Sequence, residues 1–326
     1  MKRLSIFLFL LFLGVQPIMA QSHYDIEVLQ LGDNETFDRA YDGLLDGLAR
    51  QGLVKGYNLS VTRTVIDTSP ADSLWGKLLC YLSTRNIGSQ VIRRNPDMVV
   101  TIGTSATKYF QKEIVSAGIP LVYTSAIDSV TYLKQKTSGV AINTTAVDVI
   151  NASLLALPNI RTLGIIHSND NDAVAFVHDM KVYSQRLGLK IISREVGMGE
   201  SILPAANELI AQQIDAFVVP ADGYYELKGW KASKELMTVS RKNSLPCISS
   251  LVSVTDGPFL YLSPDFQAIG DLTAACVKDI LVENIQPQER PITALNNNNY
   301  VVDLKVSREI GIAFRPMTPD LLSLND

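Results

Sequence analysis

The sequence predicts an α/β protein of two lobes, each a doubly wound parallel sheet, joined by a hinge that the chain crosses about three times. Two observations predict this fold class. Short apolar runs alternate with amphipathic helical patterns along most of the chain, which is typical of parallel sheets covered by helices on both faces. The alternation also restarts after residue 143, so the 326-residue chain would contain two such units.

Residues 1–20 are predicted to be a secretory signal peptide. A basic pair precedes an almost wholly apolar stretch at 5–15, and Ala20 provides a small residue for cleavage. The apolar stretch is too short and too weakly flanked to span a membrane. We therefore expect a mature protein that begins near Gln21 and is located in the periplasm.

The first half of the mature chain predicts alternating strands and helices. Apolar residues from Phe37 to Leu48 recur at helical spacing, and Asp33 before them is a plausible N-cap. The dipeptide Asn95-Pro96 ends the second helix, because a residue before proline is disfavoured in the helical conformation. The predicted strands are 25–31, 57–66, 98–103 and 120–126, and the predicted helices are 37–48, 72–94 and 105–114.

The same rhythm resumes in the second half. The predicted helices there are 147–156, 172–187, 201–213 and 229–243, and the predicted strands are 162–168, 189–196, 216–222 and 246–250. The C-terminal stretch then adds a strand at 259–265, a helix at 267–284, and a strand with a short helix over 300–312.

These C-terminal pieces are too few to form a domain, so they must join the existing sheets. A chain that returns to the first lobe and ends in the second would leave a hinged cleft lined by strand C-termini, where open α/β sheets bind ligands. We predict that 21–142 and 256–290 form lobe 1, and that 143–255 and 291–326 form lobe 2.

Composition narrows the class of partner. The net charge is −4 with both signs interspersed, so no basic block would recruit nucleic acid. The three cysteines, Cys80, Cys247 and Cys276, lie far apart in apolar patterns, and an odd number leaves at least one unpaired. We expect buried free thiols, with one disulfide as the alternative, and a monomeric protein.

Several segments have an order and spacing that are characteristic of a known family. They are VVTIGTSAT (99–107), IPLVYTSAIDSV (119–130), IDAFVVPAD (214–222), LYLSPDFQAIGDLTAACVKDIL (260–281) and YVVDLKVSREIGI (300–312). Together they resemble the extracytoplasmic substrate-binding proteins of ABC transporters, in the branch often described as tryptophan- or tyrosine-type uptake proteins. The resemblance covers nearly the whole mature chain. It implies a type I periplasmic-binding-protein fold, ligand capture between the lobes, and neither catalysis nor a cofactor.

The chain departs from this family's usual pattern in three places. It has Ile127-Asp128-Ser129 where relatives often carry Ser-Asp-Pro, and His167-Ser168-Asn169 where they often carry Tyr-Asn-Pro. It has Pro220-Ala221-Asp222 where they often carry Pro-Pro-Asp. All three departures fall in the predicted cleft, so they bear on which ligand is bound.

The turn Gly103-Thr104-Ser105 is the first candidate for ligand contact. Gly103 permits a sharp turn after a buried strand, and Thr104 or Ser105 would then be the helix N-cap. The N–H groups of a helix start attract an anion, and a plain structural cap is the alternative. A nucleophilic Ser105 is disfavoured, because the second glycine of a Gly-x-Ser-x-Gly elbow is missing.

Polar residues at other strand ends complete the predicted site. The resemblance and these positions together add Asn34, Thr124, Ser125, Asp128, His167, Ser168, Asp222, Tyr224, Ser250 and Tyr261. Asp128 and Asp222 could hold a cationic group of the ligand. The alternative for Asp128 is an N-cap or a hinge carboxylate. Tyr224 could stack on a flat ligand, or be a surface tyrosine that packs on its own helix. The oxygen-rich loop at 167–172 lacks the glycine and glutamate of a calcium loop, so we expect its acids to cap a helix and no metal to bind.

These observations predict a solute-binding protein that captures a small polar, amino-acid-like or aromatic ligand. Its partner would be the membrane permease of an ABC transporter. The alternative is a sensory binding protein that reports ligand to a membrane receptor.

Overall fold

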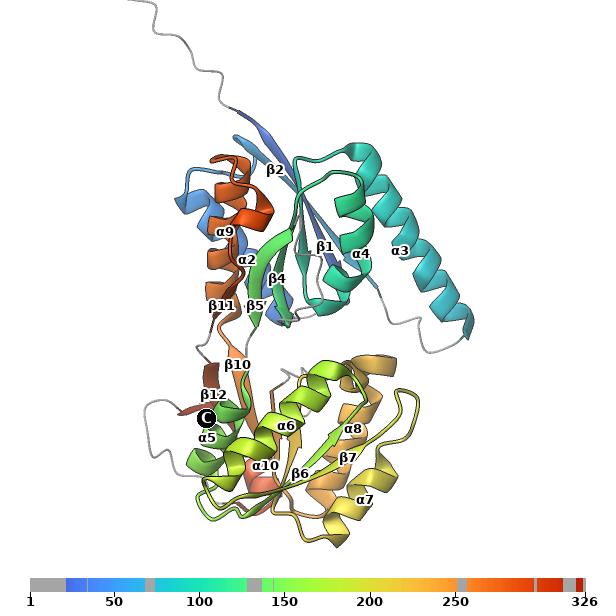
Figure 1. Cartoon of the computed structure of the whole chain (residues 1–326), viewed down its shortest axis with the longest axis vertical. Coiled ribbons are helices and arrows are strands. Elements are labelled where there is room, and N and C mark those ends of the chain that lie inside the picture. Colours follow the sequence, from blue (N-terminus) through green and yellow to red (C-terminus); the bar gives the residue numbers. More distant parts are fainter. Residues whose placement is uncertain are drawn as a thin grey trace, which may run out of the picture.

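The structure of the chain is a computed structural model, and it describes residues 22–33, 35–67, 74–127, 137–142, 144–250, 257–295, 298–312 and 321–324. The predicted signal peptide lies outside these residues. The described strands form a six-stranded and a seven-stranded sheet. Each sheet and its helices form one lobe, and the two lobes are stacked along the long axis of the molecule (Figure 1). This architecture confirms the predicted fold class.

Lobe 1 contains the sheet with strand order β11-β5-β4-β3-β1-β2, in which every pairing is parallel. Its strands are β1 (Tyr24–Leu31), β2 (Leu59–Ile66), β3 (Met98–Ile102), β4 (Leu121–Ile127), β5 (Thr137–Ile142) and β11 (Thr293–Leu295). Its helices are α2 (Glu35–Arg50), α3 (Leu74–Arg94), α4 (Thr104–Ser116) and α9 (Phe266–Leu281), followed by the 3-10 turn η3 (Pro287–Glu289). Strand β3 is buried along its whole length, which explains why its sequence is a nearly continuous apolar run.

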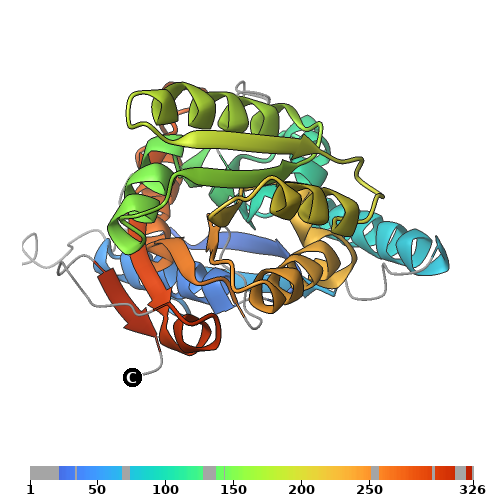
Figure 2. The same ribbon diagram turned by 90° about the horizontal axis from the view of Figure 1, so that it is seen from below.

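Lobe 2 contains the sheet with strand order β13-β12-β10-β9-β8-β6-β7. Its strands are β6 (Thr162–His167), β7 (Lys190–Glu195), β8 (Ala216–Val219), β9 (Cys247–Ser249), β10 (Leu260–Pro264), β12 (Asn298–Asp303) and β13 (Leu321–Leu324). Its helices are α5 (Ala146–Ala156), α6 (Asn171–Gln185), α7 (Leu203–Ala211), α8 (Leu227–Lys242) and α10 (Leu304–Glu309), with the 3-10 turn η2 (Gly223–Glu226) before α8. Only the pairing of β12 with β10 is antiparallel among the described strands. Seen from below, α6 lies on one side of β6 and β7, and α7 and α8 lie on the other (Figure 2).

The chain passes between the lobes three times. It leaves lobe 1 between β5 and α5, returns between β10 and α9, and leaves again between β11 and β12. Two of these passages end in capped helices. Thr145 and Asp148 form a reciprocal capping box at the start of α5, and the Asp265 side chain accepts the Ala268 N–H (3.0 Å) at the start of α9.

Two strands lie in a different sheet from the one that the predicted domain boundaries implied. Strand β10 pairs with β9 in lobe 2, with Leu260 opposite Ile248, although 256–290 was predicted for lobe 1. Strand β11 pairs with β5 in lobe 1, although 291–326 was predicted for lobe 2. Local sequence shows that a segment is a strand but not which partner it pairs with. From the described strands we propose a division into 22–142 with 266–295, and 144–264 with 298–324.

The returning helix α9 is fastened to lobe 1 by close packing on α2. A Cβ atom at Gly270 would lie 2.1 Å from the Ala40 carbonyl oxygen, and one at Gly43 would lie 2.2 Å from the Gln267 carbonyl oxygen. No side chain fits at such distances, so glycine is what allows the two helix backbones to touch. This contact holds a segment from the C-terminal third of the chain against the first of the described helices.

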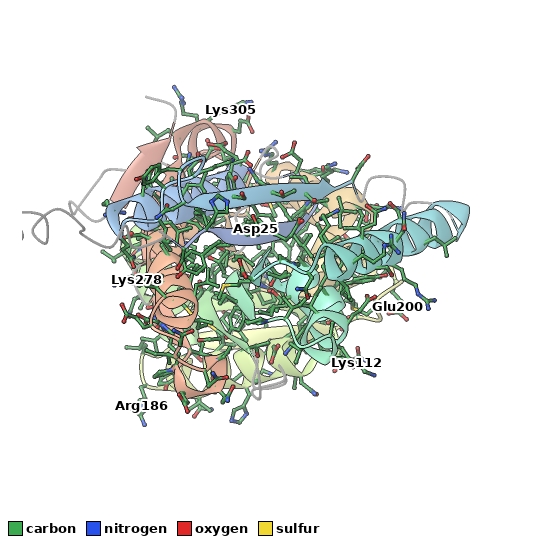
Figure 3. The ribbon with its side chains drawn as sticks, turned by 90° about the horizontal axis from the view of Figure 1, so that it is seen from above. Asp25, Lys112, Arg186, Glu200, Lys278 and Lys305 are labelled. Atoms are coloured by element: carbon green, nitrogen blue, oxygen red, sulfur yellow. The ribbon has the colours of Figure 1, made fainter. Side chains whose placement is uncertain are left out.

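The described cysteines agree with the expectation of buried free thiols. Cys247 and Cys276 are buried and unpaired, and burial raises the pKa of both thiols. The side chain of Cys80 lies outside the described residues. Charged side chains such as Lys112, Arg186 and Lys305 lie at separate points around the outline (Figure 3). Within the described ranges, no helix is both long enough and apolar enough to cross a bilayer.

Candidate functional site

The carboxyl ends of the two sheets face one another. Strand β5 leads directly into lobe 2, so its parallel neighbours in lobe 1 also end toward lobe 2. Strand β10 leads directly into lobe 1, so its parallel neighbours β9, β8 and β6 end toward lobe 1 (Figure 1). We call this region the interlobe edge. In open α/β sheets, ligands bind at the carboxyl ends of the strands.

Helix α4 begins at the interlobe edge without a side-chain cap. Its N-cap is Gly103, so the prediction that Thr104 or Ser105 is the cap was wrong. Gly103 has φ 87°, and a Cβ there would lie 2.6 Å from Cζ of Phe37, so only glycine suits this position. Thr104 is half-buried and Ser105 is exposed, and both lie in the first helical turn. The turn therefore presents backbone N–H groups, which favour an anion.

Ser125 lies beside this helix start in an unusual conformation. The Gly103 N–H donates to the Thr124 carbonyl (2.9 Å), which joins the end of β4 to the start of α4. Ser125 has φ 56° at a bulge in the pairing of β4 with β5. Its side chain is buried, and its hydroxyl has no hydrogen-bond partner among the described residues. A strained backbone and an unsatisfied buried hydroxyl are costly, and such features concentrate at functional sites.

Thr124, the preceding residue, is directed into lobe 1. Its hydroxyl and the Thr273 hydroxyl of α9 lie 2.8 Å apart in a hydrogen bond, and both residues are fully buried. Thr124 therefore ties β4 to α9. The predicted residues Asn34 and Asp128 lie outside the described residues.

Ser168 and Asp222 are bonded to each other in lobe 2. Asp222 Oδ2 accepts the Ser168 backbone N–H (2.6 Å), and Oδ1 accepts the Ser168 hydroxyl (2.9 Å) and the Tyr224 N–H (2.9 Å). Both side chains are buried, with Asp222 only 2% exposed. The ring of His167 donates Nδ1–H to the Ser168 carbonyl (2.8 Å), because a carbonyl oxygen can only accept. Asp170 caps α6 by accepting the Asp172 N–H (3.0 Å), as predicted for this loop.

Tyr224 packs inside lobe 2 and is not the surface tyrosine of the alternative expectation. It is 3% exposed, and its hydroxyl donates to the Glu200 carbonyl (3.0 Å) in the loop after β7. Its ring meets that of Tyr225 edge-on, with centroids 5.4 Å apart. Burial, with smaller contributions from nearby carboxylates, raises the pKa of Tyr224 to about 12. The phenol therefore remains a hydrogen-bond donor at neutral pH.

The other predicted residues of lobe 2 also lie near its strand ends. The Ser250 hydroxyl and backbone N–H both donate to the Val219 carbonyl (3.1 Å each), which joins the ends of β8 and β9. Tyr261 is buried in β10 opposite Ser249.

Two residues outside the predicted set support these positions. The Tyr225 hydroxyl donates to the Ile166 carbonyl (2.8 Å), and the Thr273 hydroxyl is hydrogen-bonded to the Thr124 hydroxyl. The Thr273 contact joins residues 149 positions apart, so no local pattern could have predicted it.

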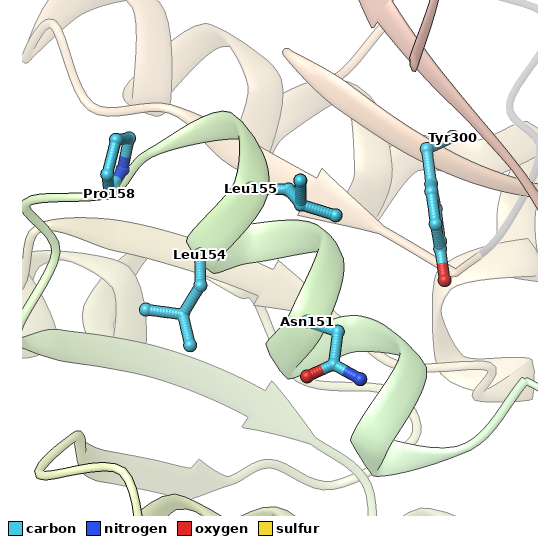
Figure 4. Close-up of a pocket in the computed structure, with 5 residues that line it drawn as sticks. All are labelled: Asn151, Leu154, Leu155, Pro158 and Tyr300. Carbon is cyan, nitrogen blue, oxygen red and sulfur yellow. The ribbon is translucent and has the colours of Figure 1, made fainter. Parts of the chain in front are cut away.

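A hollow of about 520 Å³ lies elsewhere, between α5 and β12 (Figure 4). Its lining is mainly apolar and consists of Asn151, Leu154, Leu155, Pro158 and Tyr300. None of these residues belongs to the loops after β6, β8 or β9. The hollow is therefore separate from the interlobe edge. Among the described residues, no three His, Cys, Asp or Glu side chains are grouped to hold a metal ion.

Comparisons with known proteins point to one family and one fold. Residues 25–317 match the family model described as ABC transporter substrate binding protein, and no curated protein matches the chain. One similar solved structure is the ligand-free, open form of a substrate-binding protein with adhesive properties from Clostridium difficile. The two sequences are 16% identical, the TM-score is 0.71, and the comparison covers 92% of this chain and 99% of the other.

Two further solved structures are similar to the same extent. A conserved domain protein from Vibrio cholerae is 22% identical with a TM-score of 0.69, and an ABC domain from Streptococcus pneumoniae in complex with L-Trp is 20% identical with a TM-score of 0.69. Each comparison covers 90% of this chain and 96% of the other. At these identities the likeness shows a shared type I periplasmic-binding-protein fold.

Proposed function

The chain belongs to the family of ABC transporter substrate-binding proteins, and we propose that it captures a small solute between its lobes and delivers it to the membrane permease of an ABC transporter. The observation that carries this proposal is the buried hydroxyl of Ser125, which has no hydrogen-bond partner in the part of the chain that the structure describes and lies beside the uncapped start of α4. A ligand group placed there would satisfy donors that the protein leaves open. We also propose that the chain acts in the periplasm as a binding protein without catalysis.

The chemistry of this position favours an anionic group on the ligand. The start of a helix stabilises a negative charge by roughly 0.3–1 kcal/mol before specific hydrogen bonds form. The Ser125 hydroxyl would add a charge-assisted bond, which is stronger than a bond between neutral groups. Ser105 is exposed in the same helical turn and would complete the set. A carboxylate fits these donors.

The remainder of the ligand would contact lobe 2, and closure of the hinge would bring the two walls together. A ligand that bridges both lobes stabilises the closed state, which the permease can then distinguish from the empty protein. The structural neighbour with bound L-Trp suggests an amino acid with a flat side chain as the first ligand to try.

A thermal-shift screen with the twenty amino acids and related aromatic acids tests the proposal. A ligand at 100 times its Kd should add about 2.7 kcal/mol of stability, or about 5–10 °C in Tm. Ser125→Ala should reduce the affinity about 10- to 100-fold. Ser153→Ala, which changes a buried serine of α5 remote from the edge, is the control and should bind normally. If no carboxylate ligand shifts Tm, or if both variants bind like the unmodified protein, the proposed site is refuted.

A further inference from the structure

We infer that Asp222 is a positioning residue, which locks the lobe 2 side of the binding site into one preformed wall and does not bind the ligand itself. This inference rests on the proposed function, because the wall matters only if a ligand enters between the lobes. We define the lobe 2 wall as residues 168–170, 197–200 and 222–225, which follow β6, β7 and β8.

The Asp222 carboxylate is surrounded by hydrogen-bond donors of lobe 2. Asp222 accepts three hydrogen bonds, two from Ser168 and one from the Tyr224 N–H, at 2.6–2.9 Å. Both carboxylate oxygens are engaged, and the side chain is 2% exposed. Because the side chain is almost fully buried and already accepts three hydrogen bonds, a ligand ammonium could reach it only if the surrounding loops moved apart. Hydrogen bonds to a charged acceptor contribute more to stability than bonds between neutral groups, so the existing arrangement is favoured.

The partners of Asp222 are also connected to the remaining loops of the lobe 2 wall. The Ser168 hydroxyl, while donating to Asp222, also accepts the Asp170 N–H (3.2 Å). The Tyr224 hydroxyl donates to the Glu200 carbonyl (3.0 Å), and Glu200 closes its own turn by accepting the Gly197 N–H (2.9 Å) at Oε2. The Asp222 carboxylate thus joins the loops after β6 and β8, and the Tyr224 hydroxyl joins them to the loop after β7.

The hydrogen bonding of the candidate residues differs between lobe 2 and lobe 1. There the Ser125 hydroxyl has no partner within the described ranges and its backbone is left-handed, whereas the Asp222 and Ser168 side chains are hydrogen-bonded within lobe 2. We therefore infer that lobe 1 adapts to the ligand, whereas the lobe 2 wall already has its binding conformation before the ligand arrives. Loosening a preformed wall lowers the fraction of molecules competent to bind, so it should slow association more than it speeds dissociation.

Hydrogen exchange on the ligand-free protein tests whether Asp222 holds the loops of the lobe 2 wall together. In Asp222→Asn, which is nearly isosteric, peptides covering 166–172 and 220–226 should exchange at least 10-fold faster, and they should change together. Peptides from α2 and α9 should be unchanged. Glu195→Gln removes an exposed carboxylate at the same edge of the same sheet and is the matched control. If only 220–226 changes, or if the control has the same effect, the lock is refuted.

Ser168→Ala provides a milder variant, because it removes the hydroxyl but keeps the backbone N–H bonds to Asp222. In a double-mutant cycle its effect on exchange should shrink in the Asp222→Asn background. Independent, additive effects would overturn the inference. This variant keeps the test available if Asp222→Asn does not fold.

Binding kinetics with L-tryptophan as the probe separate positioning from contact. We expect Ser168→Ala and Asp222→Asn to lower the association rate at least 5-fold while the dissociation rate stays within 2-fold. A faster dissociation rate with unchanged association would identify Asp222 as a ligand contact and refute the inference. Absence of L-tryptophan binding in the unmodified protein would count against the proposed ligand class alone, and the exchange result would still decide on the lock.

Discussion

Replacing Ser125 by glycine should make the ligand-free protein more stable and weaken ligand binding at the same time. Two features of the native residue are unfavourable in the absence of ligand. Its backbone is left-handed at φ 56°, and its hydroxyl is buried without a hydrogen-bond partner among the residues that the structure describes. Glycine removes both features, because it adopts positive φ freely and has no hydroxyl.

The size of the effect follows from these two contributions. A buried unsatisfied polar group costs about 1–3 kcal/mol, and a left-handed conformation costs a non-glycine residue about 1–2 kcal/mol. Glycine loses more backbone entropy on folding, which offsets about 0.5–1 kcal/mol of the gain. We expect a net stabilisation of about 2 kcal/mol, or about 4–8 °C in Tm.

Chemical denaturation and calorimetry on Ser125→Gly and Ser125→Ala measure the two contributions separately, because alanine removes the hydroxyl but keeps the strain. Ser244→Gly is a matched control, since Ser244 has φ 54° but is exposed in the turn before β9. That control should gain only the relief of strain and bind ligand normally. In the Ser125 variants, ligand affinity should fall about 10-fold or more.

Two outcomes would refute this reasoning. A less stable Ser125→Gly would show that the hydroxyl makes a favourable contact in the ligand-free protein. Unchanged ligand affinity in both Ser125 variants would show that the ligand lies elsewhere, whatever the stability change.

Three further predictions concern the scaffold. Gly270→Ala should destabilise the protein by about 1–3 kcal/mol in denaturation experiments, because the added Cβ would lie 2.1 Å from a backbone atom of α2. Gly199→Ala is the control and should be nearly neutral, because a Cβ at Gly199 would have no neighbouring atom within 4 Å. Because the pKa of Tyr224 is raised to about 12 in the folded state, its contribution to stability should be complete below pH 10 and be lost between about pH 10 and 12. Tyr224→Phe should therefore show a shallower loss of stability over that range, and an equal slope would contradict the buried position. Cys247, which is buried with a raised pKa, should resist thiol reagents until the protein unfolds, and mass mapping of labelled native protein checks this.

The sequence by itself determined the fold class and the positions of most elements. Apolar runs such as MVVTI predicted strands that are buried on both faces, and the restart after residue 143 predicted the second sheet. It also placed polar residues at the strand ends that face the other lobe, since parallel strands share the edge at which they end. These features depend on local patterns, which a single chain displays directly.

Only the tertiary structure decided which partners these residues have. Strand β10 and strand β11 each joined a sheet that their own sequences do not specify. Thr124 and Asp222, both candidates for ligand contact, instead bond to Thr273 and Ser168, whereas the buried hydroxyl of the candidate Ser125 has no partner among the described residues. Hydrogen bonds between residues far apart in sequence depend on how the backbone brings distant strand ends together, and no spacing along the chain encodes that distance.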